Sequence, residues 1–272
     1  MIIGFLGKGG SGKSTLATLF VRHLLDNGKS VLAVDADHNM DLADNLGQEK
    51  EMNYIGQGYA DVLNHMNIDS PKKILTQETP IYFSLSPLDA VTERYSVPLE
   101  KNLRLMVAGP HTESMMRGSG CSHGLTQPLK TYLPFLDVKQ NEAVVVDEKA
   151  GTDGVGTGIT VGFTSAVIVV EATKHGIKSA QQIAHMLRFY NTPHVFVLNK
   201  TKDEAMEKEA TEILGSKPIL SIPFDEDFAF KNSIPHKKSL DILLDHLEKT
   251  EDTRRRRLGE LLQKQNEIEH HQ

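Results

Sequence analysis

The sequence predicts an α/β fold, with a doubly wound, mainly parallel sheet flanked by helices. Two observations indicate this class. Apolar runs of strand length alternate with amphipathic stretches of helix length along the 272 residues. The apolar runs are also continuous, as expected for strands that helices cover on both faces. Because no repeat or linker interrupts this rhythm, we expect a single domain over residues 1–250 and a charged helical extension over residues 251–272.

The expected elements follow in chain order. The apolar runs predicted to be strands are Ile2–Leu6, Ser30–Val34, Ile81–Ser84, Leu103–Ala108, Ala143–Val146, Ala166–Glu171, His194–Leu198 and Ile219–Ile222. The amphipathic stretches predicted to be helices are Lys13–Asn27, Leu125–Phe135, Ile177–Tyr190 and Asp203–Leu214, followed by a long C-terminal stretch. In that stretch, four leucines recur at the spacing of one helix face and are expected to dock on the body: Leu240, Leu243, Leu244 and Leu247.

The composition limits the class of protein. Hydrophobic residues make up 39 % and charged residues 24 %, which is enough apolar material for a core. The net charge of −6 disfavours nucleic acid as the main partner, although Arg254–Arg257 form a local basic run. Apolar runs such as Ala166–Val170 are too short to cross a bilayer, and the N-terminus lacks signal-peptide features. Cys121 is the only cysteine, which fits a reducing compartment, so we expect a cytoplasmic protein.

A glycine-rich loop joins the first predicted strand to the first predicted helix. Its residues Gly7-Lys8-Gly9-Gly10-Ser11-Gly12-Lys13-Ser14 fit the phosphate-binding pattern G-x-x-x-x-G-K-[ST]. Glycines allow backbone N–H groups to surround phosphate oxygens, and the helix N-terminus adds partial positive charge. Lys13 is predicted to bridge the β- and γ-phosphates, Ser14 to ligate Mg²⁺ and Thr15 to contact the α-phosphate. The sequence therefore predicts ATP or ADP with Mg²⁺ as ligands.

Carboxylates end two further strands of the predicted sheet, at the edge where parallel sheets bind their ligands. Asp35 and Asp37 follow the second strand, and Asp147 follows Ala143–Val146. An aspartate in the position of Asp147 accepts a hydrogen bond from Mg²⁺-bound water. For Asp35 and Asp37, helix N-capping is the alternative role. The loop after Asp147 is rich in glycines that we expect to let it change shape when the γ-phosphate leaves: Gly151, Gly154, Gly156 and Gly158.

With Lys8, the loop resembles the deviant Walker A motif of the nitrogenase iron protein, the Min and Par partition ATPases and the nickel-insertion ATPases. The D-x-D-x-N stretch Asp35–Asn39 and the D-x-x-A-G stretch Asp147–Gly151 are similar to the two switches of that group. The resemblance implies a P-loop NTPase fold of the nitrogenase iron protein type. It also implies a homodimer in which Lys8 reaches the partner's nucleotide, Asp37 orients the attacking water and Asp35 has a supporting role near Mg²⁺.

The same resemblance implies a site for the nucleotide base. Asn199 resembles the adenine-contacting asparagine of the group, and the stretch Ile222–Asp225, which contains Pro223, resembles its second base-side loop. For Lys8, a solvated loop lysine is the alternative to a role in trans. In that role the ammonium would neutralise developing charge in the transition state, as an arginine finger does.

The segment Gly118–Gly124 contains Cys121 and His123. It resembles the G-x-G-C-x-C motif with which the nickel-insertion ATPases of carbon monoxide dehydrogenase bind metal between two subunits, except that His123 replaces the second cysteine. Two such pairs across a dimer would supply two thiolates and two imidazoles, a set that suits tetrahedral Zn²⁺ or square-planar Ni²⁺. The alternative is that Cys121 is a small residue in a dimer contact. His111 is either a further ligand or a solvated loop histidine.

The resemblance implies an ATP-dependent dimeric metallochaperone ATPase that inserts nickel into carbon monoxide dehydrogenase or a related client metalloenzyme. It would hydrolyse ATP to ADP and phosphate, and no nucleic-acid or membrane partner is then expected. The alternative is a Min- or Par-type partition or positioning ATPase that binds DNA or membrane when dimeric. A reductase with an iron–sulfur cluster is a third candidate, which the single cysteine disfavours because such a cluster needs two thiolates per subunit of a dimer.

Overall fold

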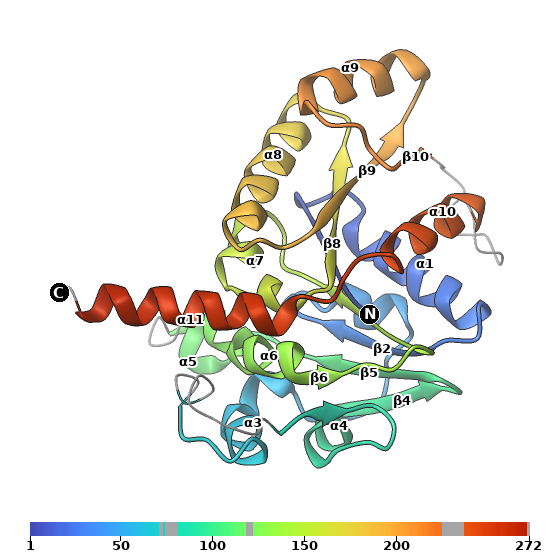
Figure 1. The fold of residues 1–272 in the computed structure, drawn as a ribbon. Coiled ribbons are helices and arrows are strands. Elements are labelled where there is room, and N and C mark those ends of the chain that lie inside the picture. The colour runs from blue at the N-terminus through green and yellow to red at the C-terminus, as the bar shows by residue number, and fades with distance from the viewer. Residues whose placement is uncertain (71–72, 74–80, 118–121, 225–236, 271–272) are drawn as a thin grey trace.

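An eight-stranded sheet forms the middle layer of the molecule (Figure 1). The computed structural model describes residues 1–70, 73, 81–117, 122–224 and 237–270. The strands lie in the order β10-β9-β8-β1-β7-β2-β5-β4, and all neighbours are parallel except β4, which is antiparallel to β5. Their bounds are β1 Ile2–Gly7, β2 Ser30–Asp35, β4 Ser96–Glu100, β5 Leu103–Val107, β7 Glu142–Asp147, β8 Ser165–Glu171, β9 His194–Thr201 and β10 Leu220–Pro223. The predicted fold class is confirmed.

Two strand predictions need correction. The run Ile81–Ser84 is not part of the main sheet: only β3 (Phe83–Ser84) is a strand, and it pairs with β6 (Leu136–Asp137) in a separate two-stranded sheet. The edge strand β4 was not predicted, because its burial alternates along the strand and because Pro98 interrupts the pattern. The remaining predicted strands match within about one residue, except that β9 continues to Thr201.

The helices surround the sheet. The longer ones are α1 Lys13–Asp26, α8 Lys174–Phe189, α9 Glu204–Leu214, α10 Lys237–Leu247 and α11 Arg254–His270. The shorter ones are α2 Asp41–Asn45, α3 Tyr59–His65, α4 Ala90–Tyr95, α5 Glu113–Met116, α6 Gln127–Tyr132 and α7 Thr152–Gly156. Short 3₁₀ segments are η1 Ile55–Gln57, η3 Ser122–Thr126, η4 Leu133–Phe135 and η5 Ile159–Gly162.

The prediction of one helix over Leu125–Phe135 is wrong. This stretch contains the end of η3, then α6 and then η4. Pro128 lies in the first turn of α6 and Pro134 in the first turn of η4. Proline has no N–H group and clashes with the preceding turn, so it fits the start of a helix and disrupts its interior.

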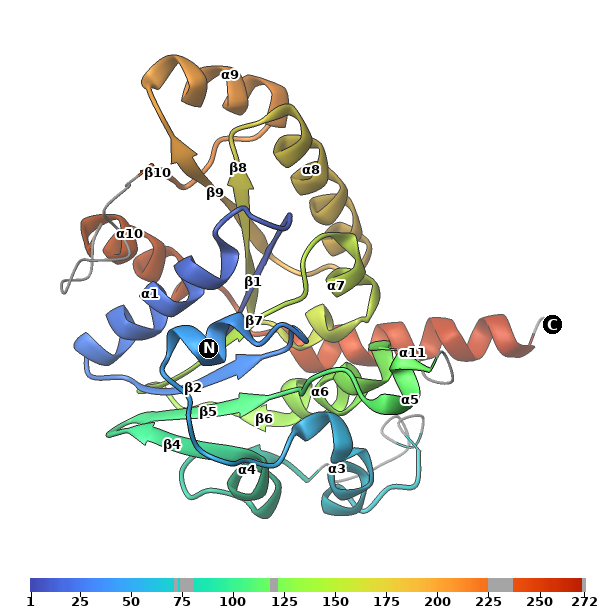
Figure 2. The same ribbon diagram turned by 180° about the vertical axis from the view of Figure 1, so that it is seen from behind.

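Each face of the sheet has its own apolar core. On β1, which is buried along its whole length, Ile3 and Phe5 point into one core and Ile2 and Leu6 into the other. Helices α1, α2 and α10 contribute to the first core, and α3, α6, α8 and α11 to the second. Figure 2 shows α1 and α10 side by side on their face. The predicted docking of the α10 leucines is confirmed, because all four are buried: Leu240, Leu243, Leu244 and Leu247.

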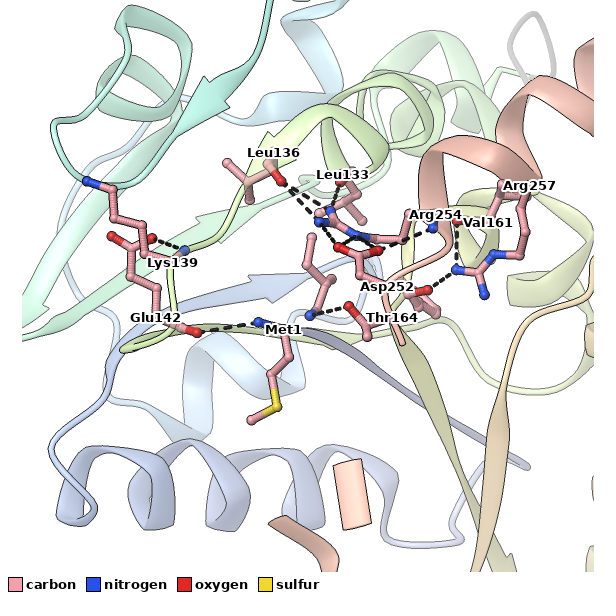
Figure 3. Close-up of polar contacts among 12 residues, drawn as sticks. Met1, Leu133, Leu136, Lys139, Glu142, Val161, Thr164, Asp252, Arg254 and Arg257 are labelled. Atoms are coloured by element: carbon pink, nitrogen blue, oxygen red, sulfur yellow. Dashed lines mark hydrogen bonds and ion pairs between the residues drawn. The ribbon is translucent and has the colours of Figure 1, made fainter. Parts of the chain in front are cut away.

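Two arginines fix the start of α11 to the body (Figure 3). The Arg254 guanidinium donates to the carbonyl oxygens of Leu133 and Leu136 and pairs with Asp252 at 2.6 Å. The Arg257 guanidinium donates to the carbonyl oxygens of Val161 and Phe163. Both side chains are buried. Helix α11 is thereby attached both to the end of the α6–η4 segment and to the segment that follows α7.

The basic run Arg254–Arg257 is therefore not a continuous surface patch. Two of its members are buried in the body, Arg255 stacks on Tyr82 at 4.0 Å and Arg256 lies 4.0 Å from Glu260. No helix in the described ranges is both long and apolar enough to cross a membrane.

Candidate nucleotide-binding site

The predicted phosphate loop lies between β1 and α1, at the carboxyl end of the central strands. Gly12 has φ of 90°, and a Cβ on this residue would lie 2.3 Å from Asn199 Nδ2, so both conformation and space require glycine. No side chain caps the N-terminus of α1. The first amide N–H groups of a helix have no partner within it, so here they remain able to bind an anion.

A buried ion pair lies behind this loop. Lys13 Nζ is 2.6 Å from Asp147 Oδ1, and both side chains are almost fully buried. The pair forms because β1 and β7 are neighbours, with Phe5 opposite Asp147 in the register. Lys13 Nζ also donates to Ser14 Oγ at 3.3 Å, so Ser14 and Asp147, two of the residues predicted at the Mg²⁺ site, lie beside the same ammonium. Burial raises the pKa of Asp147, whereas the Lys13 ammonium opposes that shift.

Some polar atoms of the site lack partners in the described structure. Asp147 Oδ2 and Ser11 Oγ are buried and make no hydrogen bond there. Buried polar atoms normally find a partner, so unpaired ones need an explanation such as a bound ion or ligand. A phosphate group with Mg²⁺ would supply both kinds of partner, an acceptor for the hydroxyl and a cation for the carboxylate. The residues present therefore fit Mg²⁺ and a nucleotide.

The switch I stretch is held in shape by its own carboxylates. Asp35 Oδ1 accepts from Asp37 N at 3.1 Å, and Asp35 Oδ2 accepts from Ala43 N at 2.9 Å in α2. Asp37 Oδ1 accepts from Asn39 N at 3.2 Å. Burial raises the pKa of Asp35 to about 7. Asp35 thus stabilises the first turn of α2 without being its N-cap, which is Met40, while its predicted role near Mg²⁺ stays a prediction.

The switch II stretch contains a residue that the sequence reasoning missed. Glu148 is fully buried beneath α7, its Oε2 has no partner in the described structure, and burial raises its pKa well above the usual value. A Cβ on Gly154 would lie 2.7 Å from Glu148 Cγ. Gly154 is therefore required by packing within α7, while the loop freedom that the glycine pattern predicted stays a prediction. The sequence did contain a signal for Glu148, because this acidic residue directly follows Asp147 at the end of a buried apolar strand.

The predicted base-side residues lie on adjacent strands. Asn199 Nδ2 donates to Ser11 O at 2.8 Å, and Pro223 ends β10, the neighbour of β9. Lys200, which was not predicted, donates from Nζ to Gly10 O at 2.7 Å. The ends of β9 and β10 therefore lie beside the phosphate loop. A base contact for Asn199 and Pro223 stays a prediction.

The remaining predicted residues are only partly described. Lys8 is exposed on the phosphate loop, as either reading of it requires. Cys121 lies outside the described residues, and His123 is described only as part of the η3 backbone. Within the described ranges, no three His, Cys, Asp or Glu side chains converge as a metal site. His111 packs against His38, with ring centroids 4.5 Å apart.

The phosphate loop, the buried lysine–aspartate pair and the parallel sheet define a P-loop nucleotide-binding domain. Its residues 2–234 match the family described as CobQ/CobB/MinD/ParA nucleotide binding domain, and the chain belongs to this family. Among curated relatives, it is 29 % identical over 192 residues to the carbon monoxide dehydrogenase accessory protein CooC of Rhodospirillum rubrum, covering 69 % of each chain. It is 25 % identical over 230 residues to an uncharacterized ATP-binding protein of Methanocaldococcus jannaschii, covering 84 % of this chain and 89 % of the relative.

Solved structures show the same fold. A ParA family ATPase from Chlorobium tepidum matches with a TM-score of 0.58 and 19 % identity, covering 96 % of both chains. The septum site-determining protein MinD from Pyrococcus horikoshii, complexed with Mg-ADP, matches with a TM-score of 0.56 and 15 % identity, covering 98 % of this chain and 96 % of that one. At these identities the likeness concerns the fold alone.

Proposed function

We propose that this protein is an ATP hydrolase that works as a homodimer and handles a transition metal, nickel or zinc, for a client metalloenzyme such as carbon monoxide dehydrogenase. The similarity to CooC supports the cargo and the client. The observation that carries the proposal is a backbone contact: Ala108 N donates to Asp35 O at 2.8 Å. Ala108 directly follows β5 and begins the segment that leads to Cys121 and His123. This segment therefore contacts switch I at the point where it leaves the sheet.

In the proposed reaction, water attacks the γ-phosphate of ATP, giving ADP and phosphate. Lys13 leaves Asp147 and binds the β- and γ-phosphate oxygens. Ser14 and Asp147 would hold Mg²⁺, which would neutralise charge on those oxygens. Asp37 orients the water, and Lys8 of each subunit reaches the partner's nucleotide. Asn199 and Pro223 contact the base.

The metal is the cargo of this cycle. Cys121 and His123 of two subunits provide thiolate and imidazole ligands, both of which bind Ni²⁺ and Zn²⁺. A dimer that closes with ATP and opens after hydrolysis brings these ligands together and then separates them. ATP can drive this change only if it binds the closed dimer more tightly than the open one.

The test is metal content per dimer. Purified protein is loaded with Ni²⁺ in the presence of a non-hydrolysable ATP analogue, desalted and analysed for nickel and for oligomeric state. We expect stoichiometric nickel that survives desalting in the wild-type dimer, loss of this tightly held nickel in Cys121→Ala and its retention in Ser122→Ala, the neighbouring control. Nickel binding that is unchanged in Cys121→Ala would remove the cysteine from the mechanism. A lack of ATP hydrolysis by the wild type would refute the ATPase itself.

A Min- or Par-type function is the second candidate, supported by the shared fold. It requires a surface that binds DNA or anionic membrane when ATP is bound. The basic run Arg254–Arg257 does not favour such a surface, because the side chains of Arg254 and Arg257 are buried and donate to backbone carbonyl oxygens. Co-sedimentation with DNA or anionic vesicles in ATP, absent in ADP, would favour this candidate over metal handling.

A further inference from the structure

Two histidines from different loops meet beside switch I. His38 directly follows Asp37, and only 7 % of it is exposed. His111 lies on the exposed loop between β5 and α5. Their ring centroids are 4.5 Å apart, with an angle of 60° between the ring planes. The contact therefore joins the nucleotide switch to the loop that leads toward the Cys121 segment.

The surroundings set the tautomer of the His38 ring. His38 Nδ1 lies 3.3 Å from Gly109 O. A carbonyl oxygen can only accept, so Nδ1 carries the proton in this contact and Nε2 keeps its lone pair. Within the described ranges, neither ring forms an ion pair with a carboxylate. A neutral imidazole whose other nitrogen donates to a backbone carbonyl is the usual form of a metal-ligating histidine.

We propose that His38 and His111 form a second transition-metal site, which binds Ni²⁺ or Zn²⁺ through two imidazoles next to switch I. Zinc–nitrogen distances of about 2.0–2.1 Å put two nitrogens of a tetrahedral site about 3.4 Å apart. The centroid distance of 4.5 Å places the two rings close enough for one ion to contact a nitrogen of each. The proposal extends the proposed metal-handling function, on which its biological role rests.

A site with two protein ligands suits transfer rather than storage. Water would complete the coordination of the ion, so the metal would exchange readily and could pass to stronger ligands. The nucleotide would control this site, because His38 directly follows Asp37, the residue proposed to orient the attacking water. If the γ-phosphate moves switch I, the rings separate and the metal is released. By linkage, bound metal then changes the affinity for ATP by the same factor.

The experiment measures Ni²⁺ affinity by competition with a chromophoric chelator, in ADP and in the Cys121→Ala background. We expect this variant to keep one exchangeable nickel per chain. Adding His111→Ala or His38→Gln weakens that binding at least about 10-fold, since one of two ligands is lost. The exposed His185→Ala is the matched control and leaves the affinity unchanged. His270 and His271, near the end of the sequence, are present in every variant, so they do not affect the differences.

His38→Gln changes a buried residue of switch I and would disturb it. The test of the proposed site therefore rests on His111→Ala, which changes an exposed loop residue. Residual nickel binding that is the same in Cys121→Ala with and without His111→Ala would overturn the proposal. A complete absence of nickel in Cys121→Ala would overturn it too, while leaving the Cys121 site of the proposed function intact. Conversely, nickel that depends on His111 and not on Cys121 would support this site and contradict the proposed role of the cysteine.

Discussion

At the scale of single residues, the site combines several buried carboxyl groups with one buried ammonium. Asp35, Asp147 and Glu148 all have raised pKa values because they are buried, and Lys13 pairs with only one of them. Such an arrangement is costly in the absence of a cation, because each ionised carboxylate has lost its hydration. Mg²⁺ and the positive end of α1 offset this cost when the nucleotide binds.

Replacing one member of the buried ion pair should lower both the stability of the protein and its rate of ATP hydrolysis. Lys13→Met leaves Asp147 buried without its ammonium, so we expect the free energy of unfolding to fall by about 3 kcal/mol and ATP hydrolysis by about 100-fold. Lys8→Met is the matched control, because Lys8 is exposed on the same loop. It should leave stability unchanged while reducing hydrolysis in the dimer. Urea unfolding and phosphate release measure the two effects, and equal stability loss in both variants would contradict this account.

The pH dependence of stability should depend on His23, which is fully buried on α1. Burial lowers its pKa, although Asp241 lies 3.1 Å from Nε2. The native state therefore favours the neutral ring, while the unfolded chain takes up a proton near pH 6.5. Stability is fully present above this pH and is lost as the pH falls toward the native pKa.

We expect His23→Gln to lose less stability than the wild type between pH 7 and pH 5, as measured by thermal unfolding. The exposed His185→Gln should follow the wild-type curve, because its ring is accessible in both states. Parallel curves for the wild type and His23→Gln would show that His23 does not carry the effect.

At the scale of elements, the packing of α7 and α11 depends on a few side-chain contacts that the hydrophobic pattern of a helix does not reveal. Helix α7 lies over Glu148 and tolerates only glycine at the point of contact. Helix α11 is tied to carbonyl oxygens at η4 and near η5 by two arginines. The Gly154 contact and the Arg257 contacts both involve the segment between switch II and β8, whereas Arg254 contacts the segment before β7.

Gly154→Ala should destabilise the protein, since the new methyl group would overlap Glu148. Overpacking of this kind costs about 1–3 kcal/mol. In the same helix, a Cβ on Gly156 would meet only Met186 Cε at 3.9 Å, so Gly156→Ala should be neutral or slightly stabilising through helix propensity. Denaturant unfolding measures the free energy of unfolding of the two variants. A similar change of this free energy in both would argue against the tight contact between Gly154 and Glu148.

Arg257→Met should release α11 from the body. The change removes charged hydrogen bonds to Val161 and Phe163 and leaves buried carbonyl groups without donors, which costs about 3 kcal/mol. Arg256→Met, in which an exposed side chain is changed, should stay within about 0.5 kcal/mol of the wild type. Hydrogen exchange of the α11 amides should rise in the first variant only. Unchanged protection there would mean that α11 is held by its leucines alone.

The sequence allowed the phosphate loop and most strands to be predicted, because each is encoded by a local pattern. The residues of Gly7–Ser14 are consecutive, and a buried strand such as β7 is a continuous apolar run. It did not allow the contacts between distant segments to be predicted. His38 with His111, and Arg254 with Leu136, come together only through the order of strands and the packing of loops. The antiparallel edge strand β4 was missed for a related reason, since an edge strand is buried only in part.

At the scale of the whole molecule, the strand order explains why nucleotide and metal chemistry could communicate. The central strands β1, β7, β2 and β5 are consecutive neighbours, and the phosphate loop, switch II, switch I and the His111 loop follow them in that order. Each loop therefore contacts the next at one edge of the sheet. A change at the γ-phosphate can reach the proposed metal ligands through neighbouring backbone, with no need for a long pathway.

The central claim is that nucleotide state controls metal affinity, and the most direct measurement is a Ni²⁺ titration of the wild-type protein in two states. One sample is saturated with Mg-ADP and the other with a non-hydrolysable ATP analogue and Mg²⁺, with nucleotide occupancy verified in both. We expect the nickel dissociation constant to differ at least about 5-fold between the two states. Superimposable titrations in the two states would contradict the claim.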